Sequence, residues 1–147
     1  MRPRLVSAFG LGGSLRLRVF RKGRLIEEWE DRNLCVQLPR ERIARLIAEG
    51  GSLPRVTKVQ VGTNGTAPSL QDTAITEPFE KPVLAISYPA PGQVQFHFAI
   101  LSGDANGKAI REFGLVCEDG TLFARKTRGV IEKDADVEIE GSWTIHV

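Results

Sequence analysis

The first candidates for chemistry are two carboxylate and two imidazole side chains. Glu138 and Glu140 stand two positions apart, a spacing that puts both carboxylates on one face of a β-strand. Such a pair can share a proton or hold a cation. His97 and His146 occupy polar positions of alternating segments, and neither has a cysteine, a histidine or a paired carboxylate nearby in the sequence. We therefore expect a solvated sheet face and no enzyme.

Motifs that bind phosphate or present a nucleophile are missing from the sequence. The glycine-rich segment 62–65 is not followed by the Gly-Lys-Ser/Thr of a phosphate-binding loop, and no Gly-x-Ser-x-Gly occurs. Cys35 and Cys117 form no CxxC pair, which favours two buried thiols in a reducing compartment. We predict no catalytic residue, no cofactor and no metal ion.

Charge is distributed unevenly although the net charge is only +2. Residues 1–58 contain 13 Lys+Arg and 6 Asp+Glu, whereas residues 59–147 contain 7 and 12. A split of this kind is typical of nucleic-acid binding or of a head-to-tail contact between subunits, which closes into a ring when the rotation allows; two ordinary solvated surfaces are the alternative. We expect a homo-oligomer, a trimer or hexamer ring. The residues expected in such a partner contact are Arg2, Arg4, Arg16, Arg18, Asp136, Glu138 and Glu140.

The elements that would carry these side chains are mostly strands. Alternation of apolar and polar residues predicts strands at 14–21, 24–31, 56–61, 83–88, 93–101, 109–116, 121–127 and 137–147. Lys22-Gly23 and Glu118-Asp119-Gly120 provide hairpin turns. In the last strand every second residue from Val137 to Val147 is apolar or glycine, so Trp143 is expected in the core.

One helix is predicted from Pro39 to Glu49. Proline suits the first helical turn, and Gly50-Gly51 suits the end. An apolar stripe at helical spacing is expected to face the core, with the arginines turned to solvent. The stripe consists of Ile43, Ala44, Leu46 and Ile47.

These elements predict a mainly β (α+β) fold, an antiparallel β-sandwich or meander with one short helix. Residues 1–13 form an N-terminal arm, and residues 14–147 form a single mostly-β domain. No apolar run reaches the roughly 18 residues of a membrane span, and the start of the chain has no clean signal-peptide cleavage site. We expect synthesis in the cytoplasm and no membrane contact. Three basic residues at 125–128 beside an acidic strand do not predict nucleic-acid binding.

Three blocks of sequence, taken in order over residues 33–147, resemble phage tail-collar-fibre-like proteins of the tail fibre or baseplate. The first is Asn33-Leu34 followed by Arg42-Ile43-Ala44-Arg45-Leu46-Ile47. The second is Val56-Thr57-Lys58-Val59-Gln60-Val61-Gly62-Thr63 with Thr66-Ala67-Pro68 and Gln71-Asp72-Thr73-Ala74-Ile75. The third is Ile110-Arg111-Glu112-Phe113-Gly114-Leu115 with Asp119-Gly120-Thr121-Leu122-Phe123-Ala124-Arg125.

The resemblance implies a non-catalytic structural protein of the virion tail, in the fibre attachment, collar or baseplate, made in the host cytoplasm. Its partners would be other phage tail proteins, with Arg2 and Arg4 lying against an adjacent subunit. Glu112 is expected to form a structural salt bridge with Arg125 across a hairpin, so that reversing both charges restores stability. The alternative function is a host-receptor or carbohydrate-binding β-domain, for which Trp29 and Tyr88 are the candidate platform residues.

Overall fold

The structure is a computed structural model that describes residues 10–147. Arg2 and Arg4, with most of the predicted arm, lie outside the described residues. Within the described range the chain forms nine strands and one helix: β1 Gly12–Arg21, β2 Arg24–Cys35, α2 Gln37–Glu49, β3 Val56–Gly62, β4 Phe79–Pro82, β5 Ala85–Ser87, β6 Gln93–Ile100, β7 Ala109–Cys117, β8 Leu122–Glu132 and β9 Val137–His146.

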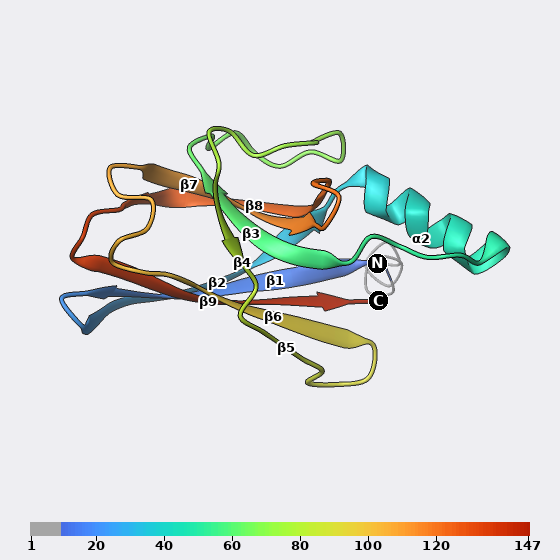
Figure 1. Cartoon of the computed structure of the whole chain (residues 1–147), viewed down its shortest axis with the longest axis horizontal. Coiled ribbons are helices and arrows are strands. Elements are labelled where there is room, and N and C mark those ends of the chain that lie inside the picture. Colours follow the sequence, from blue (N-terminus) through green and yellow to red (C-terminus); the bar gives the residue numbers. More distant parts are fainter. Residues whose placement is uncertain (1–9) are drawn as a thin grey trace, which may run out of the picture.

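The strands form one antiparallel sheet in the order β4-β3-β7-β8-β2-β1-β9-β6-β5. β2 and β8 pair through only two residue pairs, Leu34 with Arg125 and Cys35 with Ala124. Beyond these pairs the sheet curls into two facing layers, β4, β3, β7 and β8 in one and β2, β1, β9, β6 and β5 in the other (Figure 1). The predicted mainly β fold with antiparallel strands is confirmed.

Period-two alternation places the core between these layers. On β9 the side chains of Ile139, Trp143 and Ile145 are buried, as predicted. Gly141 continues the same inner face, and a Cβ there would collide with the ring of Phe98 on the neighbouring strand β6. Glycine is therefore required at this position so that the Phe98 ring can lie flat beneath β9.

Several strand boundaries differ from the prediction. β2 and β8 continue to Cys35 and Glu132, past the predicted ends at 31 and 127, and β1 begins at Gly12 rather than 14, because Gly12 and Gly13 already pair with β9. The predicted strand 83–88 contains only β5, and the charged, proline-ended β4 precedes it. Val83 and Leu84 connect β4 to β5, which belong to different layers of the curled sheet. We call this crossing the seam. The backbone N–H of Val83 donates to the carbonyl of Thr57, and that of Leu84 donates to the carbonyl of His97.

Helix α2 ends at Glu49 as predicted but begins at Gln37, two residues before the predicted start at Pro39, and the burial of its apolar stripe was predicted wrongly. Only Pro39 is buried, and Ile47 is 81% exposed. The helix extends past the end of the sheet, so no strand lies against its second half (Figure 1). Arg40 and Arg42, expected in solvent, instead attach the helix to the body. Arg40 donates to the carbonyls of Cys35 and Leu11, and Arg42 donates to Asp119 and Thr121.

Candidate functional site

The predicted partner-binding residues of β1 and β9 lie side by side on the outer face of the sheet. These strands are antiparallel neighbours, and Arg18 stands directly opposite Glu140. Arg18 Nη1 is 3.5 Å from Glu140 Oε1, and Arg18 Nε is 3.5 Å from Glu28 Oε2 on β2. Arg16 Nη2 lies 3.7 Å from the same Glu28 oxygen. The basic and acidic groups that suggested a contact between subunits thus already compensate one another within one chain.

The remaining acidic residues of the predicted contact lie at the start of β9, Glu138 within the strand and Asp136 immediately before it. Asp136 Oδ2 is 4.0 Å from Arg21 Nη1, while Asp134 is closer to the same arginine at 3.4 Å. Arg21 contributes to holding the pKa of Asp134 below its usual value, after the larger effect of the Asp136 backbone N–H. Glu138 forms no ion pair within residues 10–147. Arg16, Arg18 and Glu140 are therefore one cluster, with Asp136 and Glu138 nearer the start of the strand.

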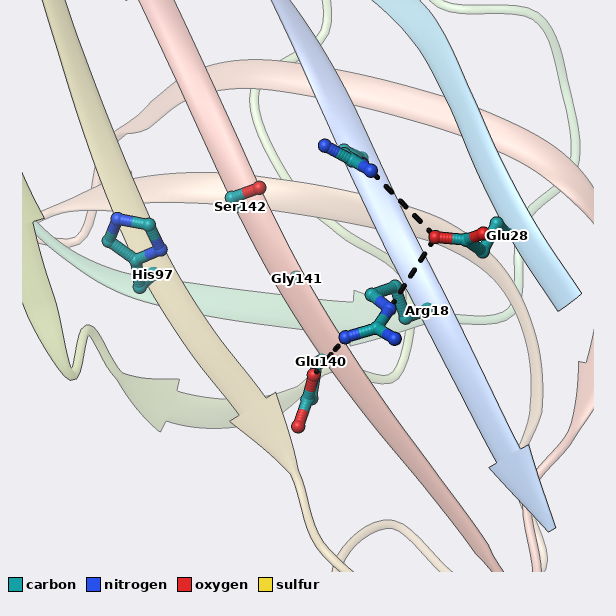
Figure 2. A pocket seen from close by; sticks show the side chains of 7 residues that line it. Arg18, Glu28, His97, Glu140, Gly141 and Ser142 are labelled. Atoms are coloured by element: carbon teal, nitrogen blue, oxygen red, sulfur yellow. Dashed lines mark ion pairs between the residues drawn. The ribbon is translucent and has the colours of Figure 1, made fainter. Parts of the chain in front are cut away.

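A shallow hollow of about 400 Å³ lies over this cluster. Its lining is Arg16, Arg18, Glu28, His97, Glu140, Gly141 and Ser142. Figure 2 shows His97 on β6 across the hollow from the charged side chains. The paired side chains are 44–60% exposed, and ion pairs so exposed contribute only about 0.2–1 kcal/mol each. The arrangement can bind polar groups of a partner but does not enclose a substrate.

Next to this hollow, a serine and a histidine lie in contact, a combination of residue types that also occurs in catalytic sites. His97 Nε2 lies 3.2 Å from Ser87 Oγ on β5, a contact with no signal in the sequence because it spans two strands. A serine nucleophile also needs a group that orients the histidine. Among residues 10–147 no carboxylate hydrogen-bonds to His97, and no group of three or more His, Cys, Asp or Glu side chains could hold a metal ion. The contact joins a polar residue of the edge strand β5 to one of its neighbour β6.

The predicted Glu112–Arg125 salt bridge is present and almost completely buried. Arg125 Nε donates to Glu112 Oε1 at 2.8 Å, and the two side chains are 2% and 0% exposed. They lie diagonally across the β7–β8 hairpin, since Glu112 stands opposite Thr127 and Arg125 opposite Gly114. A charge pair this deep must be satisfied on all sides to be tolerated.

Further partners come from the segment between β3 and β4. Arg125 Nη1 donates to Asp72 Oδ2 at 3.0 Å, and Nη2 donates to the carbonyl of Asn64 at 2.9 Å. Glu112 Oε2 accepts from the backbone N–H groups of Asn64 at 2.9 Å and Thr76 at 3.0 Å. We call these residues, Asn64, Asp72, Thr76, Glu112 and Arg125, the buried network. Nothing in the sequence pointed to Asn64 or Thr76, because their contribution is backbone.

The buried network joins the sequence blocks that carry the family resemblance. Gly62 and Gly114 pack closely on Ile75, and a Cβ at either would collide with that side chain. Leu34 pairs with Arg125, so the first block meets the third at the junction of β2 and β8. The three blocks, separate in sequence, form one continuous part of the fold.

The aromatic residues that a sugar-binding surface would need do not converge. Trp29 is half-buried and lies against two cations, with Arg128 Cζ 5.2 Å and Lys126 Nζ 5.8 Å from its ring centre. Tyr88 is 77% exposed and directly follows β5. Strand β2, which carries Trp29, is separated from β5 by β1, β9 and β6. Lys126 and Arg128 are themselves paired with carboxylates, those of Asp31 and Glu27.

No helix within residues 10–147 is long and apolar enough to cross a bilayer. In comparisons with known proteins, no family model, curated protein or solved structure matches the chain. We accordingly infer its function from its own residues and contacts.

Proposed function

We propose that this chain is a non-catalytic structural protein of a phage tail, a component of the fibre attachment, collar or baseplate. The observation that carries the proposal is the buried network. Its side chains come from the second and third of the blocks that resemble phage tail proteins, and its central pair, Glu112 and Arg125, is 0% and 2% exposed. Residues so enclosed can hold a scaffold together, but they cannot reach a substrate.

The outer face supports the same proposal. Arg16, Arg18, Glu28 and Glu140 form a charged surface without an enclosed cleft. Charged, exposed residues set specificity and rim contacts in protein assemblies more than they set affinity. In the proposed setting the partners are other tail proteins and further copies of the chain in a trimer or hexamer ring, with no cofactor, nucleic acid or membrane involved.

Charge alone does not drive such a ring, because Arg18 is already compensated by Glu28 and Glu140 of its own chain. Apolar contact has to supply the affinity. We assign Arg16, Arg18, Asp136, Glu138 and Glu140 to the rim of the subunit contact, and Arg2 and Arg4 to the contact with an adjacent tail subunit.

Electron microscopy of native particles tests the location. We expect density for this chain in the tail at a copy number that follows the ring symmetry, and the chain should be found by mass spectrometry in purified particles. Particles that are complete and infectious without the chain would contradict the proposal.

Charge-reversal variants test the rim. Glu138→Lys changes an outer-face residue without an ion pair within residues 10–147 and should lower incorporation into particles. Glu132→Lys, an exposed change at the end of β8, is the matched control and should incorporate normally. Equal incorporation of the two variants would remove the outer face of β9 from the contact.

A further inference from the structure

Strand β5 is an edge of the sheet with an unusual composition. No Asp, Glu, Lys or Arg occurs from Val83 to Gly103, although 26% of the chain is charged. Exposed edge strands are ordinarily protected from pairing with other chains by charged residues, especially lysine. The opposite edge, β4, follows that rule, since Glu80 pairs with Lys58 and Lys81 pairs with Asp104. β5 has no such protection.

Ile86 on β5 faces the core side of the sheet and is nevertheless exposed. Ile86 stands directly opposite Phe96 on β6, so the two side chains share a face of the sheet. Phe96 is 6% exposed, whereas Ile86 is 52% exposed, and Leu84, which lines the same hollow just before β5, is 65% exposed. The inner face of the sheet thus continues onto β5 without being covered there.

An apolar hollow marks the uncovered region. It measures about 430 Å³ and is lined by Arg55, Val56, Thr57, Val83, Leu84, Ala85 and Ile86. The bonds from Val83 to Thr57 and from Leu84 to His97 close the seam at one end, and past them β3 and β5 are not hydrogen-bonded to each other. In Figure 1, β5 lies at the margin of its layer with no strand beyond it.

We propose that the β5 edge pairs antiparallel with the β5 edge of a second copy of this chain across a two-fold axis. An isologous contact of this kind needs a self-complementary edge, and residues 84–88 provide one. With the axis at Ile86, this residue meets the second copy's Ile86, and Leu84 meets the second copy's Tyr88.

Charge and area favour a second copy over a strand of another kind. Arg55, the charged residue in the lining of the hollow, is 81% exposed and pairs with Glu118. Pairing two uncharged β5 edges brings no further charge to the hollow, whereas most segments of this chain, and of any chain of similar composition, would do so. The second copy's Leu84 and Tyr88 also supply apolar area beside the uncovered side chains. This contact goes beyond the tail proposal and does not depend on it, because it rests on the edge alone.

Light scattering on the intact chain tests the contact. At about 100 μM protein, where an interface of micromolar affinity is saturated, the mass should be twice the 16.2 kDa of one chain. Ile86→Lys should weaken dimerisation by about tenfold or more, because lysine ammonium groups would meet at the axis. Ile47→Lys, which changes an equally apolar and more exposed residue of α2, is the matched control and should leave the dimer intact.

A cysteine variant keeps the test decisive if Ile86→Lys fails to fold. Directly opposite residues of an antiparallel pair have Cβ atoms about 4.5–5.5 Å apart, so oxidation of Ile86→Cys should give a covalent dimer. The native cysteines are buried, and Ile47→Cys serves as the control. A single chain at about 100 μM, an assembly that Ile86→Lys leaves unchanged, or equal cross-linking at 86 and 47 would each overturn the proposal. None of these results would bear on whether the chain is found in tail particles.

Discussion

The two charged residues at the centre of the buried network, Glu112 and Arg125, each have further hydrogen-bond partners: Glu112 accepts from donors, and Arg125 donates to acceptors. Glu112 accepts from two backbone N–H groups in addition to Arg125, and Arg125 donates to Asp72 and to a carbonyl. If the two charges were exchanged, an arginine at 112 would point donors at donors, and a glutamate at 125 would face a carboxylate. The charge-swap rescue expected from the hairpin alone is therefore revised, because the pair does not exist in isolation.

We expect Arg125→Met to lower the free energy of unfolding by about 3–5 kcal/mol, since it leaves a buried carboxylate without its counter-charge. The double change Glu112→Arg with Arg125→Glu should not recover this loss. Urea unfolding of the single and double variants gives the comparison. Recovery of more than half of the loss by the double variant would show that the other partners contribute little.

Trp143 is fully buried, and its indole Nε1 donates to Asn33 Oδ1 at 2.8 Å. Trp143→Ala should cost about 3–5 kcal/mol through lost packing. Trp143→Phe should cost less, about 1–3 kcal/mol, mostly from the unpaired Asn33 oxygen. Chemical denaturation followed by circular dichroism measures both, and a loss below about 1 kcal/mol for the alanine variant would contradict the burial of this strand face.

Burial raises the pKa of the Cys35 thiol from 9.0 to about 11. Because the folded state favours the neutral thiol, this contribution to stability is fully present below pH 9 and is lost as the pH rises towards about 11. The free energy of unfolding should fall over that window, and Cys35→Ala should flatten the fall. Urea titrations between neutral and alkaline pH test this, with Cys117→Ala as the comparison, since burial raises the pKa of that thiol as well. Parallel curves for wild type and Cys35→Ala would contradict the assignment.

At the scale of elements, α2 is held by its first turns and by arginines rather than by its apolar stripe. We expect Ile47→Ser to change the free energy of unfolding by less than about 0.5 kcal/mol, as exposed positions do. Ile110→Ala, at a position that is 0% exposed, should cost about 2–5 kcal/mol and serves as the control. A large loss at Ile47 in thermal or urea unfolding would mean that the second half of α2 is covered in solution.

At the scale of the whole molecule, the two glycines at the start of β1 determine how many N-terminal residues can be removed without loss of stability. Gly12 and Gly13 pair with His146 and Ile145 on β9, and Gly13 also pairs with Asn33 on β2. Removing residues 1–13 should therefore lower the melting temperature by at least about 2 °C relative to removing residues 1–9. Scanning calorimetry of the two truncations measures the difference, and equal melting temperatures would show that these pairs add no stability.

The shorter truncation is also the better variant for the predicted role of Arg2 and Arg4. It removes both arginines and leaves β1 complete. We expect it to be incorporated less efficiently into particles. Normal incorporation would remove these two residues from the proposed subunit contact.

Local patterns of sequence were sufficient to predict the strand type, most turns and the end of the helix at Glu49. The alternation from Val137 to Ile145 predicts which side chains share a face, because a strand has a period of two whatever lies next to it. Lys22-Gly23 predicts a hairpin turn because Gly23 readily adopts the positive φ that the turn requires. In the structure Gly23 has a φ of 78°, and Lys22 is also at positive φ, 50°. Glu112 and Arg125 were predictable partners because one hairpin contains both.

Only the tertiary structure decided what each face meets. Arg18 faces Glu140 of its own chain because β1 pairs with β9 from the far end of the sequence, and no local pattern encodes that pairing. Ile47 and Ile86 are apolar at the right period, yet both are exposed because the sheet ends before it covers them. Periodicity is a property of neighbours along the chain, whereas burial and charge compensation depend on segments that fold together from a distance.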